Sequence, residues 1–124
     1  MNQLKKILYI EDDYMTRDIV RRFVGKTYEI DMAESGEAAL IMTEKNNYDC
    51  FLIDIGLNGG LNGIEVTKEI KKIGNNKNKP FIAVTGYAMR KEKEYILNSG
   101  LTHYISKPFN SRELLELLEN TIGH

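Results

Sequence analysis

Five acidic, hydroxyl or basic side chains stand at the ends of short apolar runs, at four separate places in the chain. They are Glu11, Asp12, Asp54, Thr85 and Lys107. Carboxylates crowded together raise one another's pKa, and a bound divalent cation reverses that cost. A few carboxylates together with water and a phosphate oxygen suit Mg²⁺. If the fold brings these residues together, they predict a magnesium site.

The same side chains fit chemistry at phosphorus. An aspartate can attack phosphorus and carry the group as an aspartyl phosphate, while a metal and a lysine neutralise the transferred oxygens. In this scheme Glu11 and Asp12 hold the metal and Asp54 is the nucleophile. Lys107 then pairs with the phosphoryl group, and Thr85 donates a hydrogen bond to it.

Each residue also has a structural explanation. Asp54 ends the apolar run Cys50–Asp54 and precedes a glycine-rich loop, where aspartate commonly bonds the backbone ahead of it. The acids after Ile10 suit the first turn of a helix. Lys107 suits a solvated loop, and Thr85 suits a strand end. Singly these explanations suffice, but their coincidence at four strand ends favours a common site.

Hydrophobic patterning predicts the elements that position these residues. Short apolar or alternating runs predict five strands, at 6–10, 29–33, 50–54, 81–85 and 103–106. Helical periodicity predicts helices over 14–26, 36 to about 46, 63–73 and 89–99, and a last helix after Asn110. This alternation predicts one α/β domain with a doubly wound parallel sheet. Ligands of such sheets bind beyond the carboxyl ends of the strands.

Two details sharpen the helix predictions. Ser35 is placed to cap the second helix, and Asn110 with Glu113 forms a capping box for the last one. The apolar positions of the first helix, which we expect to face the core, are Met15, Ile19, Val20, Phe23 and Val24.

Composition excludes several classes of function. With 124 residues and a net charge of -1, the chain has no basic footprint for nucleic acid or for a membrane surface. It contains no signal peptide core and no apolar stretch long enough for a bilayer, so we expect a cytoplasmic protein. Cys50 is the only cysteine and is expected to be buried and inert. His103 and His124 have no partner at zinc-ligand spacing.

Four motifs together resemble the receiver domain of two-component response regulators, including the chemotaxis regulators. The motifs are Ile7-Leu8-Tyr9-Ile10-Glu11-Asp12-Asp13, Phe51-Leu52-Ile53-Asp54 with Gly63 beyond its loop, Val84-Thr85-Gly86 and Lys107-Pro108-Phe109. The resemblance covers Lys6 to about Ile122. It implies a flavodoxin-like sheet of strand order 2-1-3-4-5, and a receiver over 1–124 with no output domain.

This resemblance implies a role for each site residue. Asp54 is the phosphoacceptor, loaded from a sensor histidine kinase or a histidine phosphotransfer protein. Glu11, Asp12, Asp54 and the backbone carbonyl of Gly56 would bind Mg²⁺.

The resemblance also implies a switch. Thr85 and Lys107 would contact the phosphoryl group, and Tyr104 matches an aromatic residue whose ring turns inward as Thr85 moves. The output face would comprise the fourth helix, the fifth strand and the fifth helix, and would meet a downstream protein that the sequence does not identify.

The sequence departs from the family pattern after Asp54. Asn58 stands where the family usually has proline, and Gly59-Gly60 lengthen the loop by one residue before Gly63. By the resemblance, the two positions that tune phosphoryl lifetime in the family, two beyond Asp54 and two beyond Thr85, are Gly56 and Tyr87 in this sequence. Glycine offers attacking water no side chain and tyrosine can shield it, so we expect slow autodephosphorylation.

Other functions remain open from sequence alone. A magnesium-dependent phosphohydrolase with Asp54 as nucleophile would need an acid or base beside the nucleophile. The position two residues beyond Asp54, where an aspartate would serve, is Gly56, which has no such group. A flavin or nucleotide carrier would need a phosphate-binding loop after the first strand, which the sequence lacks. A degenerate receiver that only binds a partner is a further alternative. We expect a phosphoacceptor signalling domain rather than an enzyme.

Overall fold

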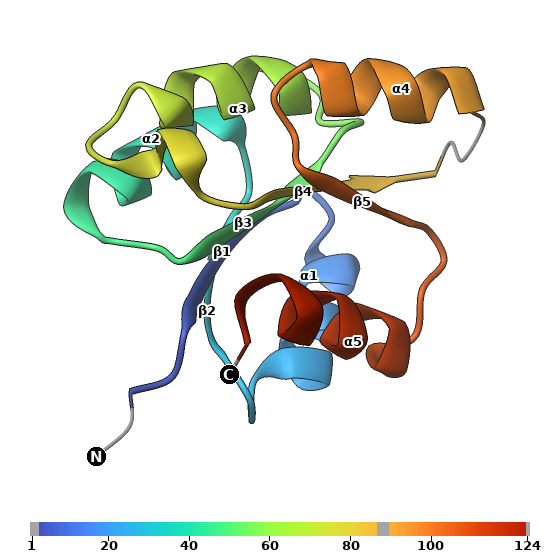
Figure 1. Cartoon of the computed structure of the whole chain (residues 1–124). Helices are drawn as coiled ribbons and strands as arrows, with labels where there is room; N and C mark the ends of the chain where they lie inside the picture. Colours follow the sequence, from blue (N-terminus) through green and yellow to red (C-terminus); the bar gives the residue numbers. More distant parts are fainter. Residues whose placement is uncertain (1–2, 87–89, 124) are drawn as a thin grey trace.

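The computed structural model describes residues 3–86 and 90–123. Strands and helices alternate from end to end of the described chain (Figure 1). The strands are β1 (Lys6–Ile10), β2 (Glu29–Ala33), β3 (Cys50–Asp54), β4 (Phe81–Thr85) and β5 (His103–Ser106). The helices are α1 (Tyr14–Val24), α2 (Gly36–Lys45), α3 (Gly63–Lys71), the short 3₁₀ helix η1 (Asn76–Asn78), α4 (Arg90–Asn98) and α5 (Ser111–Ile122).

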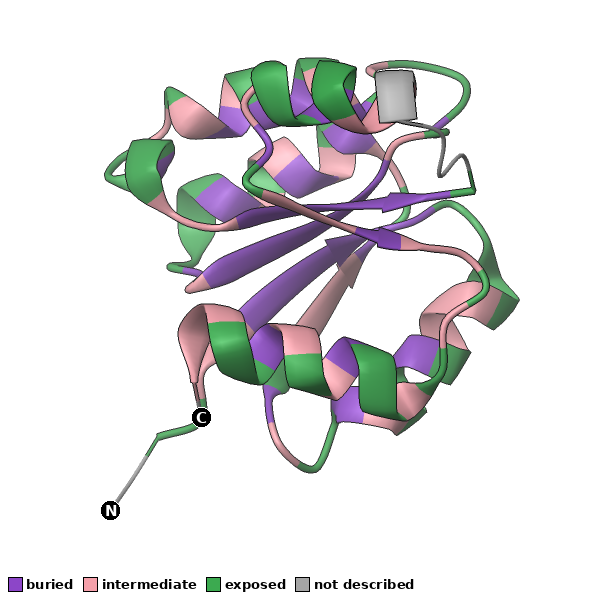
Figure 2. Ribbon diagram, turned by 45° about the vertical axis from the view of Figure 1, so that its right-hand side comes forward, coloured by how far each residue is buried: buried purple, intermediate pink, exposed green. Residues whose placement is uncertain are grey.

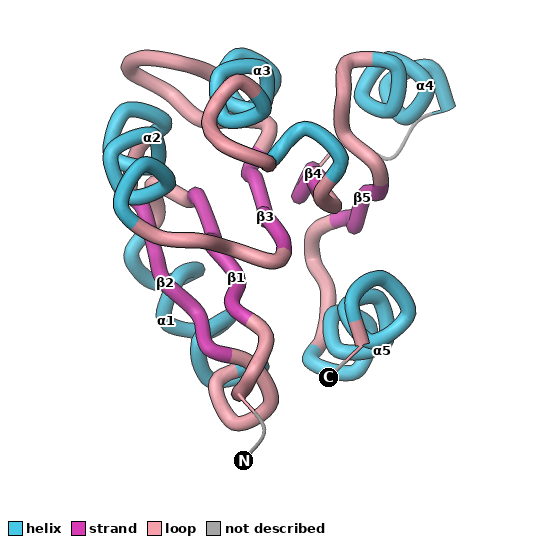
Figure 3. The backbone as a smooth tube through the Cα atoms, turned by 60° about the vertical axis from the view of Figure 1, so that its left-hand side comes forward, coloured by secondary structure: helices cyan, strands magenta, loops and turns pink. Residues whose placement is uncertain are grey.

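The strands form one parallel sheet of order β2-β1-β3-β4-β5, which confirms the predicted fold. Helices α2, α3 and α4 cover one face of the sheet, and α1 and α5 cover the other (Figures 1 and 3). The strand that carries Asp54 is central, with a neighbour on each side. Asp54 therefore lies at the end of a central strand rather than on an outer strand of the sheet.

Alternation along the strands explains why their apolar runs are continuous. In β3, Phe51 and Ile53 pack with the core on the α2, α3 and α4 side, whereas Cys50 and Leu52 pack with the core on the α1 and α5 side. Because both faces are covered by helices, every position of β3 is buried (Figure 2). The buried strands therefore determine where the residues that follow them stand at the carboxyl edge of the sheet.

The predicted caps begin the helices as expected. The Ser35 side chain accepts a hydrogen bond from the Ala38 backbone, and Asn110 and Glu113 form the full capping box of α5. A second capping box, which the sequence reading did not predict, pairs Asn62 with Glu65 at the start of α3. This box fixes the point where the loop after Asp54 ends.

Some helix boundaries and faces differ from the prediction. Helix α1 ends at Val24 rather than at residue 26, and α3 ends at Lys71 rather than at residue 73. Met15 and Ile19 do not face the core, because they are 70% and 47% exposed. The first turn of α1 lies where the strands have ended, so it has little sheet beneath it to pack against.

Candidate functional site

The register of the sheet brings four strand ends to one rim. Ile10 is level with Ile53, and Asp54 is level with Val84. Thr85 is in turn level with Ser106, so Lys107 lies one position beyond it. The rim residues of β1, β3, β4 and β5 thus stand at similar heights, as parallel strands require.

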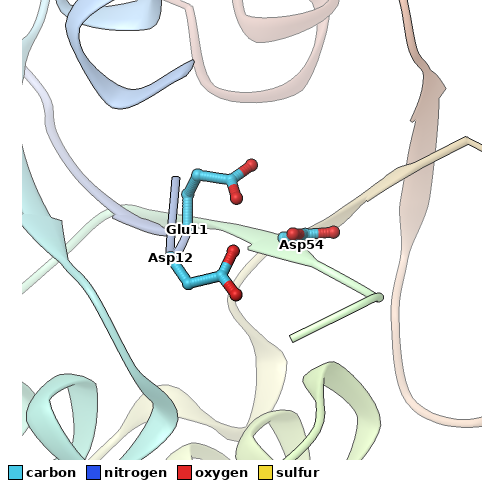
Figure 4. A group of neighbouring side chains, drawn as sticks. All are labelled: Glu11, Asp12 and Asp54. Carbon is cyan, nitrogen blue, oxygen red and sulfur yellow. The ribbon is translucent and has the colours of Figure 1, made fainter. Parts of the chain in front are cut away.

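Three carboxylates meet at this rim. Glu11, Asp12 and Asp54 each offer an oxygen within 4.8 Å of the others. Figure 4 shows the side chains of Glu11 and Asp12 leaving the end of β1 and extending to the side on which Asp54 lies. Glu11 and Asp54 are buried, at 1% and 8% exposure, whereas Asp12 is exposed. The group is therefore open to a small solute on the Asp12 side.

Lys107 completes the rim with a positive charge. Its Nζ donates to Glu11 Oε1 at 3.1 Å and lies 3.8 Å from Asp54 Oδ2. Burial acts to lower the pKa of Lys107, but the hydrogen bond that Lys107 donates to Glu11 and the charge of Asp54 outweigh it and raise the pKa. The Lys107 ammonium therefore stays charged, and it lies between the carboxylate of Glu11 and that of Asp54, the candidate nucleophile.

Glu11 is held by further donors that sequence reasoning missed. The hydroxyl of Tyr9, which is fully buried, donates to Glu11 Oε1 at 3.0 Å, and the Asp13 backbone donates to Oε2 at 3.2 Å. Burial and the charge of Glu11 raise the pKa of Tyr9, so its hydroxyl remains a donor. The signal was present in the sequence, because residues two apart on a strand share one face.

The carboxylate group fits a hard divalent cation. Its ligand atoms are all oxygen, which suits Mg²⁺ better than a transition metal. Burial, followed by the hydrogen bond and charge of Glu11, raises the pKa of Asp12. A divalent cation would relieve this crowding of like charge. Glu11, Asp12 and Asp54 can hold such an ion, and Asp54 can at the same time present an oxygen to phosphorus.

The loop after Asp54 approaches this residue near both of its ends. The Gly56 backbone N–H donates to Asp54 Oδ1 at 3.0 Å, which orients the carboxylate. A Cβ added at Gly63 would lie 2.7 Å from the Asp54 carbonyl oxygen and 2.9 Å from Ile55 Cα. Glycine is therefore required where α3 begins. The extra residue of the loop lies between these two contacts.

Backbone contacts join the rest of the rim. Thr85 is 3% exposed at the end of β4, and its carbonyl oxygen accepts from the Lys107 backbone N–H at 2.8 Å. Lys107 and Pro108 are joined by a cis peptide bond. Thr85 and Lys107 are thus brought together, as the sequence predicts.

Tyr104 lies one strand away from the carboxylates. It is half-buried against the core on the α2, α3 and α4 side, and the Lys93 ammonium stands 4.7 Å from its ring centroid. Tyr87, the other residue of predicted regulatory interest, lies outside the described residues.

A wide hollow at the opposite edge of the sheet is a poorer candidate. It measures about 900 Å³ and includes Lys6, Glu29 and Asp49 in its lining. The Lys6 backbone N–H donates to the Asp49 carboxylate at 2.7 Å, and the Lys6 ammonium lies 3.6 Å from Asp31. Lys6 and Asp49 thus already have partners, and the cluster of three carboxylates lies at the other edge of the sheet, so we locate the chemistry at the carboxylate rim.

Comparison with known proteins gives an independent result. The family described as "Response regulator receiver domain" matches residues 7–119. The chain is 32% identical over 120 residues to the polar-differentiation response regulator DivK of Brucella ovis, covering 96% of this chain and 97% of DivK. It is 36% identical over 126 residues to hybrid signal transduction histidine kinase I of Dictyostelium discoideum, covering 95% of this chain but only 7% of that protein.

Solved structures share the fold. The Vibrio cholerae chemotaxis protein CheY4 superposes with a TM-score of 0.91 at 25% identity, over 97% of this chain and 100% of that one. The receiver domain of sensor histidine kinase PA1611 from Pseudomonas aeruginosa gives 0.87 at 29% identity, over 98% and 100%. That domain was solved with a magnesium ion coordinated in its active-site cleft.

Proposed function

The chain belongs to the response regulator receiver domain family of two-component signalling, and from this premise we propose that Asp54 accepts a phosphoryl group in the presence of Mg²⁺. Receiver domains are phosphoacceptor modules rather than conventional enzymes. The observation that carries the proposal is the meeting of three carboxylates and the Lys107 ammonium at one rim.

The chemical step is a transfer from nitrogen to oxygen. An Asp54 carboxylate oxygen attacks the phosphorus of a partner's phosphohistidine, and a P–O bond forms as the P–N bond breaks. The electron pair of the P–N bond stays on the ring nitrogen, which takes a proton from solvent, so that neutral imidazole leaves. Glu11, Asp12, Asp54 and the Gly56 carbonyl would hold Mg²⁺, which when bound supplies positive charge to the phosphoryl oxygens.

Lys107 and Thr85 support the same step. Lys107 lies 3.8 Å from Asp54 and would turn from Glu11 toward the new phosphoryl oxygens. Thr85 would donate its hydroxyl to one of them. Because the Lys107 backbone bonds the Thr85 carbonyl, movement at either residue would reach β5 and Tyr104. We therefore propose α4, β5 and α5 as the output face for an unidentified downstream protein.

The proposed donor is a sensor histidine kinase or a histidine phosphotransfer protein. The exposed apolar side chains of Tyr14 and Met15 begin α1 just after the acids Glu11 and Asp12, and so flank the rim that a phosphohistidine must reach; Ile19 lies about one turn further along the helix. Among the described residues no helix is long and apolar enough to cross a membrane. We propose that the protein acts in the cytoplasm, without a nucleic acid or membrane partner.

The proposal is tested with a small phosphodonor. Wild type and Asp54→Asn would each be incubated with acetyl phosphate and Mg²⁺, with chelator added to a parallel sample, and analysed by intact mass. We expect one base-labile phosphoryl group on wild type only, lost when Mg²⁺ is removed. Continuous turnover of phosphate esters would instead identify a phosphohydrolase. An absence of both adduct and turnover would leave a receiver that only binds.

Phosphoryl lifetime is a separate proposal that rests on Gly56 and Tyr87. We propose slow autodephosphorylation, because Gly56 has no side chain with which to orient attacking water. The half-life of the adduct in wild type would be compared with that in Gly56→Asn. A wild-type half-life no longer than that of the variant contradicts the proposal.

A further inference from the structure

We propose that Glu37, at the start of α2, is a positioning residue for the phosphorylation site. It would act through the loop of residues 55–62, which follows Asp54 and carries Gly56. This inference rests on the proposed function, since it concerns the metal and phosphoryl chemistry of that loop. It assigns a role to a residue that lies 24 positions from its loop partner Leu61.

A hydrogen bond joins Glu37 to the loop. The Leu61 backbone N–H donates to Glu37 Oε1 at 2.8 Å. Leu61 also packs over the first turn of α2, because a Cβ added at Gly36 would lie 3.0 Å from Leu61 Cβ. The far part of the loop is therefore seated on the beginning of α2.

Gly60 permits this contact. A Cβ added at Gly60 would lie 2.6 and 2.7 Å from the two carboxylate oxygens of Glu37. A larger residue would push the carboxylate away and break its bond to Leu61. The Gly59-Gly60 pair makes this loop one residue longer than the family pattern. The extra residue therefore lies next to the hydrogen bond between Leu61 and Glu37 of α2.

The other contacts of the loop indicate which part of it depends on the hydrogen bond to Glu37. Among the described backbone hydrogen bonds of residues 57–61, the one to Glu37 joins the loop to another element, while the side chain of Leu57 packs into the core. The flanking ends are fixed by β3 and by Gly63 against the Asp54 carbonyl. A longer loop has more conformations to lose on ordering. Anchoring it at Leu61 restricts the orientations open to the Gly56 carbonyl.

Loss of the anchor would weaken the site without destroying it. The carboxylates and Lys107 stand on strand ends and keep their places. Only the loop ligand becomes less well oriented. We expect Glu37→Ala to weaken Mg²⁺ binding and to slow phosphorylation by acetyl phosphate, each about fivefold, the scale of one exposed hydrogen bond.

The test uses Gly60 as the matched partner. Gly60→Ala displaces the Glu37 carboxylate, so it should reproduce the loss caused by Glu37→Ala. The double variant should be no worse than either single one, because both changes remove the same contact. Mg²⁺ affinity is measured by titration calorimetry, and the rate of adduct formation by intact mass.

Two further variants separate the hydrogen bond from charge. Glu37→Gln keeps an oxygen acceptor and should restore most of the wild-type affinity, whereas a pure charge effect would leave it as weak as Glu37→Ala. Glu34→Ala removes an exposed carboxylate on the approach to α2 and should have no effect.

The outcomes distinguish this inference from the proposed function. Losses that multiply in the double variant, or a wild-type affinity in Glu37→Ala, would overturn the role of Glu37. Wild type that binds Mg²⁺ but forms no adduct would overturn the phosphoacceptor function and leave the anchoring role to be decided by calorimetry. Wild type that neither binds Mg²⁺ nor forms an adduct would overturn both.

Discussion

At the scale of single residues, the site is organised around the buried carboxylate of Glu11. Its Oε1 accepts from the Tyr9 hydroxyl and from Lys107, and its Oε2 accepts from the Asp13 backbone. A carboxylate at 1% exposure needs such donors, since burial of an unpaired charge is costly. These hydrogen bonds satisfy the buried carboxylate oxygens of Glu11 and fix their orientation at the site.

Tyr9→Phe tests this dependence. The substitution keeps the ring but removes one donor from a buried carboxylate, so we expect the free energy of unfolding to fall by about 1–3 kcal/mol at neutral pH. The measurement is urea unfolding without metal. Tyr48→Phe is the matched control, because Tyr48 donates to Asp31, whose side chain is 32% exposed and can bond water instead. A loss in Tyr9→Phe no larger than in the control contradicts the argument.

At the scale of elements, α1 combines a packed face with an exposed apolar start. Val20 and Val24 are buried against the sheet, while Tyr14 and Met15 are 72% and 70% exposed. Large exposed apolar side chains beside a reactive rim are suited to contact with another protein. We therefore expect α1 to determine how a protein donor approaches Asp54.

Met15→Glu should separate docking from chemistry. We expect phosphotransfer from a histidine-phosphorylated partner protein to slow about tenfold or more, because a charge would replace apolar contact at the edge of the interface. Phosphorylation by acetyl phosphate, which needs no docking surface, should stay within twofold of wild type. The control is Ile41→Glu, an exposed apolar position on α2. Equal slowing with both donors would place the defect in the site itself.

The strands were predictable, whereas some helix ends and faces were not. Runs such as Phe81–Thr85 are bounded by polar or turn residues and are buried throughout, so composition alone marks their limits. Helical periodicity predicts which side of α1 is apolar. It does not show that the sheet ends before Met15, so the exposure of this residue could not be predicted. Asn76 stands among polar and turn-forming residues, which favour an exposed loop, yet it is buried and its Nδ2 donates to the Ile70 carbonyl at 3.4 Å.

The candidate site was predictable because the fold gathers strand ends. Glu11, Asp54, Thr85 and Lys107 lie in four separate segments, and the parallel order alone places them at one rim. The hydrogen bond between Leu61 and Glu37 could not be predicted from the sequence, because no local pattern marks it and it joins α2 to a loop of unusual length. The chemical roles of these residues stay predictions until the phosphorylation experiments are done.

At the scale of the whole molecule, the core buries several ionisable groups in their neutral forms. Burial raises the pKa of the Cys50 thiol to about 12. Burial, followed by the influence of Glu11, raises that of Tyr9. Burial and a hydrogen bond to Asp31 raise that of Tyr48. In the unfolded chain these groups ionise at their ordinary values of 9.0 for the thiol and 10.0 for the phenols.

These shifts predict a loss of stability in alkali. The folded state binds more protons above pH 9, so the contribution is complete below the unfolded pKa and is lost as pH rises toward the folded one. Each group contributes a slope of at most about 1.4 kcal/mol per pH unit. Urea unfolding between pH 7 and pH 11 measures it. We expect a shallower decline in Cys50→Ala and an unchanged one in Tyr14→Phe, which alters an exposed ring. A flat profile would contradict the prediction.

Both ends of the described chain emerge at the amino edge of the sheet. The lead-in to Lys6 enters there, and the Tyr28 hydroxyl, just before β2, donates to the Gly123 carbonyl at 2.7 Å after α5 has returned. The carboxyl ends of the strands, which carry the carboxylate rim, lie at the other edge (Figure 1). A tether, surface or fused domain attached at either end would therefore leave the rim uncovered, which makes the fold suitable for use as an interchangeable module.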